Sequence, residues 1–148
     1  MIGRREFGLA GVSAAAWSAM HAVGVADDKQ SHNGHDGVFM ECARACSDCQ
    51  RECDACAHHC GTMLSEGKKD HLETLRSCQD CADVCATAAQ IVARKGLFSH
   101  GICEACADIC AICAKACDKH PNDKMMARCA DECRECEKAC REMMKHKK

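Results

Sequence analysis

Eighteen cysteines dominate the chemistry available to this 148-residue sequence. Residues 41–60, ECARACSDCQRECDACAHHC, place six thiols at gaps of 4, 3, 4, 3 and 4. Such gaps put side chains on one face of an α-helix. The same spacing recurs in three later segments, so the sequence predicts helices that each carry a stripe of thiols. The thiols are Cys42, Cys46, Cys49, Cys53, Cys56, Cys60, Cys78, Cys81, Cys85, Cys103, Cys106, Cys110, Cys113, Cys117, Cys129, Cys133, Cys136 and Cys140.

Disulfides, zinc and iron–sulfur clusters fit this spacing poorly. Cysteines three or four apart in one helix are badly placed for disulfide geometry, and disulfide scaffolds are usually rich in loops. Zinc sites gather four ligands, often on tight knuckles, whereas the C-x-x-C pairs here lie within continuous helix. The chain has no C-x2-C-x2-C run ending in Cys-Pro, so the sequence does not indicate a ferredoxin. These alternatives stay open but are not favoured.

Cu(I) fits the pattern better, because this soft ion prefers thiolate and thioether ligands. Two thiolates one helical turn apart can bracket an ion, and a thiolate can bridge two ions. A continuous column of thiols therefore suits many Cu(I) ions in a row. Methionines extend the stripes, since Met63 follows Cys60 by three residues, Met126 precedes Cys129 by three, and Met143 follows Cys140 by three. Sequestration of other soft metals would use the same ligands.

Four helical segments must position these thiols. We expect helices over residues 36–66, 70–95, 99–120 and from 122 or 123 to the end, with no alternating strand pattern. Asp70 and Glu73 suggest a capping box, and Gly96 a C-terminal glycine. Short connections predict antiparallel neighbours. The predicted fold is all-α, an antiparallel four-helix bundle with a cysteine-lined interior.

Composition supports a cysteine-filled core and limits the function. After residue 26 the chain has no Trp or Tyr and only 13 Leu, Ile, Val and Phe residues. Cysteine must therefore supply much of the interior as a small buried hydrophobe. A net charge of −2 gives no basic field for nucleic acid. A redox enzyme is a weaker hypothesis, because no βαβ pattern carries the C-x-x-C pairs and no set of catalytic residues stands out.

The leader of the chain indicates export. Arg4, Arg5 and Phe7 precede a mildly apolar run that ends near Ala26. This pattern resembles a twin-arginine signal over residues 1–26, and it is too short and too weakly apolar for a membrane span. A flexible tail is expected over residues 27–35 and the bundle over residues 36–148. The predicted location is the periplasm or the cell exterior, with no membrane attachment after the leader is removed.

The stripes CARACSDC, CEACADICAIC and CADECREC on successive helices resemble those of the bacterial copper storage proteins, a family of cysteine-rich four-helix bundles. The resemblance covers residues 36–146 and most of the leader. It implies reversible storage of many Cu(I) ions inside the bundle and a homotetramer of bundles. The second helix departs from the pattern, because it carries few thiols.

Apolar residues beside two stripes suggest a surface for self-association. Segment three carries Ile102, Ala105, Ile109, Ile112 and Ala116, and segment two carries Val84, Ala88 and Ile91. The corresponding positions of the other two segments are charged. Exposed apolar stripes usually mark an interface, although packing within the chain would also explain them.

The two ends of the bundle are expected to differ. One end collects His59, His71, His120, Met63 and Met126, of which Met63, His71, His120 and Met126 are predicted ligands in addition to the thiols. Thioether and imidazole hold Cu(I) less firmly than thiolate, so this end is predicted to be a mouth. The opposite end collects Val38, Phe39, Val92, Leu97, Phe98 and Ile102 and is predicted to be an apolar plug.

Overall fold

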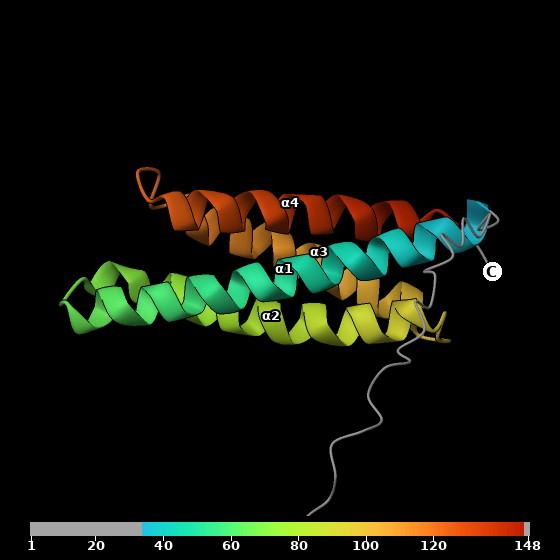
Figure 1. Cartoon of the computed structure of the whole chain (residues 1–148), viewed down its shortest axis with the longest axis horizontal. Coiled ribbons are helices and arrows are strands. Elements are labelled where there is room, and N and C mark those ends of the chain that lie inside the picture. The colour runs from blue at the N-terminus through green and yellow to red at the C-terminus, as the bar shows by residue number, and fades with distance from the viewer. Residues whose placement is uncertain (1–33, 147–148) are drawn as a thin grey trace, which may run out of the picture. The chain divides into compact units, whose positions relative to one another are not determined.

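The computed structural model describes residues 34–146 and shows a bundle of four α-helices (Figure 1). The helices are α1 (Gly34–Ser65), α2 (Leu72–Ala93), α3 (Ser99–Cys117) and α4 (Lys124–Met144), and a short 3-10 helix, η1 (Lys69–His71), precedes α2. The predicted leader and the first part of the predicted tail, residues 1–33, lie outside the described residues. The last two residues of the tail begin α1.

The helices pack in a square, each against its two neighbours. α1 lies beside α2 and α4, and α3 lies beside the same two helices. The connections are short, so neighbouring helices run antiparallel (Figure 1). No strand occurs within residues 34–146. The predicted all-α four-helix bundle is confirmed. None of its helices is long and apolar enough to cross a membrane.

The ends of α1 and α2 share one hydrogen-bond pattern but use different residues. Gly67 closes α1 with φ of 87°, and the N–H of Lys68 reaches back to the Met63 carbonyl at 3.0 Å. At the end of α2 the left-handed residue is Lys95, with φ of 51°, and Gly96 N–H bonds to the Ile91 carbonyl at 2.9 Å. Gly96 therefore follows the end of α2 as predicted, and the left-handed residue is Lys95, one position before it.

Gly96 is still required at its position, for a steric reason. A Cβ there would lie 3.0 Å from Cγ2 and 3.1 Å from the carbonyl oxygen of Ile91. The chain turns so closely over the last turn of α2 that only a residue without Cβ fits without a shift.

The predicted capping box at Asp70 and Glu73 is also wrong. Asp70 lies inside η1, and α2 begins at Leu72 without a side-chain cap. The backbone supplies the missing acceptor, because Leu72 N–H bonds to the Lys69 carbonyl of η1. By contrast, α4 begins as predicted: Asp123 is its N-cap and accepts hydrogen bonds from the N–H groups of Met125 (2.9 Å) and Met126 (3.3 Å).

Sulfur and small side chains fill the core. All 18 cysteines are buried, each with at most 1% of its surface exposed. Alanines such as Ala82, Ala107 and Ala130 pack beside them, and the few large buried side chains lie toward the two ends of the bundle. A four-helix bundle normally buries Leu and Ile at these positions. This core therefore gains less from apolar burial and holds far more sulfur.

Candidate metal centre

The thiol stripes of the four helices meet along the bundle axis. Sulfur atoms from different helices approach to 3.6–4.0 Å, for example Cys46 Sγ to Cys140 Sγ at 3.6 Å and Cys53 Sγ to Cys133 Sγ at 3.7 Å. Cys85, on the thiol-poor α2, reaches Cys106 and Cys110 of α3 at 3.6 Å each. The contacts link one set of thiols to the next along the bundle. We call the whole set of 18 cysteines the thiol column.

The column divides into groups of four thiols whose sulfur atoms lie within 4.8 Å of one another. The groups share members, because Cys49, Cys53, Cys129, Cys133 and Cys136 each belong to two of the groups named next. Five of these groups are Cys46, Cys106, Cys136 and Cys140; Cys49, Cys53, Cys81 and Cys133; Cys49, Cys85, Cys110 and Cys136; Cys53, Cys113, Cys129 and Cys133; and Cys56, Cys78, Cys117 and Cys129. Shared thiols suit bridged ions in a row better than separate closed tetrahedra.

The thiols are free in this structure. All 18 cysteines lack disulfides, and their closest sulfur–sulfur contacts are far longer than the S–S bond of about 2.05 Å. A soft metal bonds to thiolate sulfur at about 2.3 Å, judged from zinc, so an ion between two thiolates spans up to about 4.6 Å. The observed spacings are close to this span. The column can therefore bracket metal ions after small side-chain adjustments.

Neighbouring thiols change one another's proton affinity. The hydrogen bond between Cys81 and Cys110 lowers the pKa of Cys81 to about 7. The hydrogen bond with Cys56, followed by burial, raises the pKa of Cys60. Since a metal ion binds the thiolate, each ion that enters must displace protons from such groups. Metal binding by the column is consequently coupled to pH.

Histidines gather at the end of the bundle where α1 ends and α2 begins. The rings of His71 and His120 stack with centroids 4.1 Å apart, and His59 lies edge-on to His71 at 6.3 Å. Nδ1 of His71 and Nε2 of His120 are buried and make no hydrogen bond with any described residue. Burial, and then the neighbouring His120, lower the pKa of His71, so its ring is neutral at pH 7. Buried nitrogens without partners are unusual, and they suit a bound ion.

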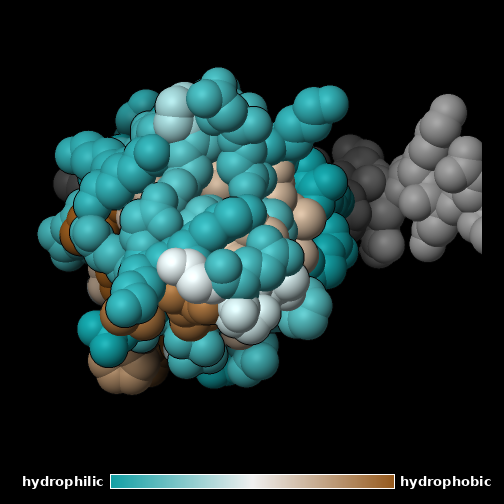
Figure 2. All heavy atoms as spheres, turned by 90° about the vertical axis from the view of Figure 1, so that its left-hand side faces the viewer, coloured by the Kyte–Doolittle hydropathy of each residue, from teal (hydrophilic) through white to brown (hydrophobic). Residues whose placement is uncertain are grey.

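Of the two methionines predicted as ligands, one lies against the column and the other does not. Met126 is fully buried, with its sulfur 3.3 Å from Cys56 Sγ. Met63 is half-buried, and its sulfur lies 3.1 Å from the ammonium group of Lys68. The thioether of Met63 therefore faces the rim of this end. Figure 2 views the same end and shows mainly hydrophilic side chains there, with small apolar areas between them.

The opposite end is closed by some of the residues predicted for it, while two others are exposed. Phe39, Val92 and Met143 are fully buried and cover the axis. Leu97 and Phe98 were predicted to belong to the plug but are 87% and 77% exposed. They lie in the tight α2–α3 connection, which turns their side chains outward. Val38 and Ile102 pack partly buried against the core.

Asp123 is a residue of this site whose second role the sequence did not reveal. Its Oδ2 accepts a hydrogen bond from His59 Nε2 at 2.7 Å, while its Oδ1 caps α4. Burial alone would raise the pKa of Asp123, but the hydrogen bonds from His59 and from the N–H groups of Met126 and Met125 lower it. One carboxylate thus connects the end of α1 to the start of α4. Its position before the helix signalled the cap, whereas nothing local signalled the histidine.

Comparison with known proteins agrees with this geometry. The profile of a family described as copper storage protein matches residues 27–145. A cytosolic copper storage protein from Streptomyces lividans, solved with five coppers, is 29% identical with a TM-score of 0.71, and the match covers 78% of this chain and 98% of that one. A second structure of that Streptomyces protein, loaded with 10 copper equivalents, is 31% identical with a TM-score of 0.68, covering 74% and 85%.

A Bacillus protein gives a similar result. The Cu(I)-bound copper storage protein BsCsp3 is 36% identical with a TM-score of 0.62, and the match covers 70% of this chain and 94% of that one. No curated protein sequence matches the chain significantly. The family match, the shared fold and the thiol-lined interior therefore agree: each is that of a copper storage protein.

Replacing Asp123 with Asn is expected to destabilise the metal-free bundle in a pH-dependent way. Asn keeps a capping oxygen but loses the charge that faces His59. The folded structure lowers the pKa of Asp123, so its charge stabilises the fold at pH values above the usual aspartate pKa of about 3.9. This contribution is lost as the pH falls through the lowered pKa. The pair is about one quarter exposed, so we expect a loss of about 1 kcal/mol or less at pH 6 and a smaller loss at pH 3.

Urea unfolding of reduced, metal-free protein at both pH values measures this. Asp83→Asn, an exposed change on α2, is the matched control and should have little effect at either pH. An equal loss at pH 6 and pH 3 for Asp123→Asn would show that the charge is not responsible.

Proposed function

The chain belongs to the copper storage protein family, and we propose that it stores many Cu(I) ions on the thiolates of the column. The observation that carries this function is the sharing of thiols between adjacent four-cysteine groups. Shared thiolates can bridge ions, so the groups act together as one extended store. The ions are the cargo of the protein, and storage or detoxification of copper is its task.

Charge balance in the interior favours a high capacity. A thiolate carries one negative charge and Cu(I) one positive charge, and unbalanced charge in a buried core is costly. A core in which thiolates and ions are equal in number is neutral, whereas two thiolates per ion leave an excess negative charge. Filling toward one ion per thiol therefore stabilises the loaded interior.

We propose that Met63, His71, His120 and Met126 form a mouth through which Cu(I) reaches the column. The two buried histidine nitrogens without partners and the Met126–Cys56 contact support this role. The hollow beside them, bordered by His71, His120 and Asp123, is open to solvent. Weaker imidazole and thioether ligands at the rim and stronger thiolates inside would draw ions inward.

We propose that two or more bundles associate through the surface between α2 and α3. Ile112 is 62% exposed, and Ile109, Ile102, Val84 and Ile91 are partly exposed along the same two helices. Ala88 and Ala116, which were predicted to lie on this surface, are buried within the bundle instead. A homotetramer is the assembly that the sequence resemblance implies.

We also propose that the mature protein is exported. The twin-arginine pattern of residues 1–26 supports this, and the family match begins at residue 27, where the leader is expected to end. That route carries folded proteins, so the thiols could bind their cargo before they meet an oxidising compartment. Sequencing the N-terminus of protein recovered from the periplasm tests the proposal, and an uncleaved chain would contradict it.

The first expected result is a large Cu(I) capacity. Anaerobic titration of the reduced protein, in competition with a Cu(I) chelator, should saturate well above two ions per chain and approach one ion per thiol. The loaded protein should also unfold at a higher temperature, because ions that bind only the folded chain stabilise it. Saturation at one or two ions would contradict storage and favour a single structural or transfer site.

The second expected result is slower uptake without loss of capacity when the mouth is altered. The variant Met63→Leu, His71→Leu, His120→Leu and Met126→Leu removes the rim ligands but keeps all 18 thiols. The control His58→Leu with Met40→Leu changes exposed residues outside the mouth. If the mouth variant takes up Cu(I) as fast as the control, ions do not pass these residues.

The third expected result concerns assembly. Ile109→Glu with Ile112→Glu places two charges on the proposed surface and should reduce the mass in solution to that of one chain. Ala127→Glu, at an exposed site on α4, should leave the mass unchanged. Sedimentation measures both. An unchanged assembly in the Ile variant would exclude this surface.

A further inference from the structure

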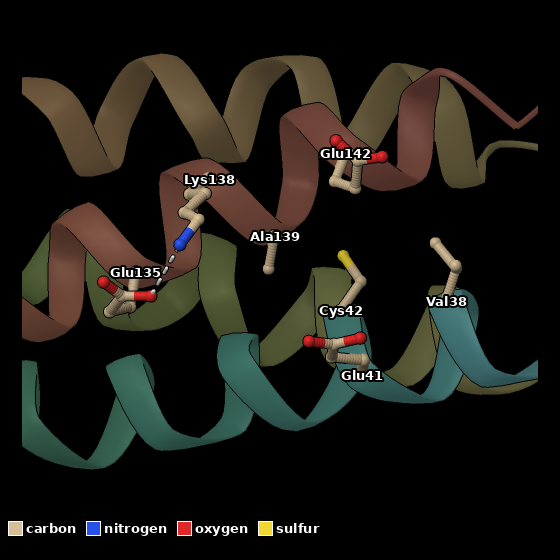
Figure 3. Close-up of a pocket in the computed structure, with 7 residues that line it drawn as sticks. All are labelled: Val38, Glu41, Cys42, Glu135, Lys138, Ala139 and Glu142. Carbon is tan, nitrogen blue, oxygen red and sulfur yellow. Dashed lines mark ion pairs between the residues drawn. The ribbon is translucent and has the colours of Figure 1, made fainter.

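A groove between α1 and α4 reaches the thiol column from the side. It encloses about 240 Å³, and Val38, Glu41 and Cys42 of α1 face Ala139 and Glu142 of α4 across it (Figure 3). Figure 3 shows the sulfur of Cys42 directed into the space between the two helices. A water molecule occupies about 30 Å³, so the groove has room for several.

Cys42 belongs to the column as well as to the wall of the groove. Its Sγ lies 3.7 Å from the sulfurs of Cys103 and Cys140, and Cys140 continues the contacts to Cys46 at 3.6 Å. Three other surface hollows have no cysteine in their walls, including the one beside His71 and His120. A metal ion in the α1–α4 groove would therefore meet a thiol of the column directly.

The groove lies at the end of the bundle that is closed along its axis. Phe39, Val92 and Met143 are buried there and cover the column. Cys42 and Cys60 are 18 residues apart in α1, which corresponds to about 27 Å of helix. Ions that used only the histidine end would have to pass every other thiol to reach this end. A side opening removes that requirement.

The charges around the groove favour a cation. Three carboxylates, Glu41, Glu135 and Glu142, and one ammonium group, that of Lys138, line the groove. Glu135 pairs with Lys138 at 3.8 Å and Glu142 pairs with Lys145, whereas Glu41 makes no ion pair with any described residue. Farther along the same α1–α4 seam, Glu132 of α4 lies near Asp48 and Glu52 of α1, and Arg128 pairs with Glu52. The seam thus has a negative potential, which concentrates cations and repels anions.

We propose that this groove, which we call the side portal, is a second access route by which Cu(I) reaches Cys42, Cys103 and Cys140 without passing the histidines. The inference rests on the proposed storage of Cu(I). Glu41, which has no ion-pair partner among the described residues, attracts the ion, with Glu142 on the opposite wall. Cys42 is the first thiol to bind it, and it loses its proton to solvent and binds as the thiolate. The proposed assembly surface lies on α2 and α3, whereas the side portal lies between α1 and α4.

Filling the side portal tests the route. Ala139→Phe places a ring in the groove, and Ala127→Phe places the same ring at an exposed site of α4 as a control. Both are made in the mouth variant, where the remaining uptake depends on the side portal. The rate of anaerobic Cu(I) uptake from a weak Cu(I) complex should fall about tenfold with Ala139→Phe and stay unchanged with the control. Equal rates would overturn the proposal.

Removing charge tests the same route without adding bulk. Glu41→Gln with Glu142→Gln should slow uptake in the mouth variant and weaken its dependence on salt. Glu104→Gln with Asp83→Asn changes the net charge equally, at exposed positions away from the groove, and should have no effect. These variants decide the question if the Phe variant does not fold, which circular dichroism reports. No difference between the two charge variants would overturn the side portal.

The number of Cu(I) ions bound at equilibrium distinguishes a failure of the storage proposal from a failure of the side portal alone. If the wild-type chain saturates with one or two ions, storage fails and the side portal fails with it. If capacity is large but neither groove variant changes the uptake rate, only the side portal fails.

Discussion

The close approach of 18 thiols along one axis is the constraint on which the rest of the structure depends. Cysteine and alanine are small, so four helices must come close together before their side chains touch. The three- and four-residue gaps keep each stripe on the inner face over the whole length of a helix. The square arrangement, the antiparallel order and the tight connections all follow from bringing these stripes together.

The same atoms serve both the fold and the cargo. Protonated thiols behave as small hydrophobic groups and pack at ordinary contact distances. Ionised thiols would repel one another at these distances, unless a cation is bound between them. The interior is therefore compatible with two states, a protonated one and a metal-loaded one. Loading exchanges protons for ions within a framework whose helices need not separate.

The ends and sides of the bundle differ in chemistry, whereas the thiol column is uniform along its length. Histidine, methionine and aspartate meet where α1 ends and α4 begins, and buried apolar residues close the other end. Between the helices, the α2–α3 side is apolar whereas the α1–α4 side is acidic. The residues around the core thus make the two ends of the bundle, and its two sides, chemically different.

The sequence by itself determined the bundle and the members of the thiol column, because helical periodicity is a local property and each of the four segments shows it, although the second carries fewer thiols. It also placed Asp123 at the start of α4 and His71 and His120 at one end. It did not reveal that Lys95, rather than the glycine after it, takes the left-handed conformation. It also predicted a capping box at Asp70, whereas a backbone hydrogen bond from Leu72 to Lys69 acts at the start of α2.

Only the tertiary structure decided which side chains from different helices meet. The stacking of His71 on His120, the bond from His59 to Asp123 and the groove beside Cys42 each join residues more than 45 positions apart in the chain. Likewise, Leu97 and Phe98 are as apolar as a plug requires, yet the turn between α2 and α3 directs them outward. Such outcomes depend on the rotation of each helix about its axis and on the path of each connection, neither of which is a local property of the sequence.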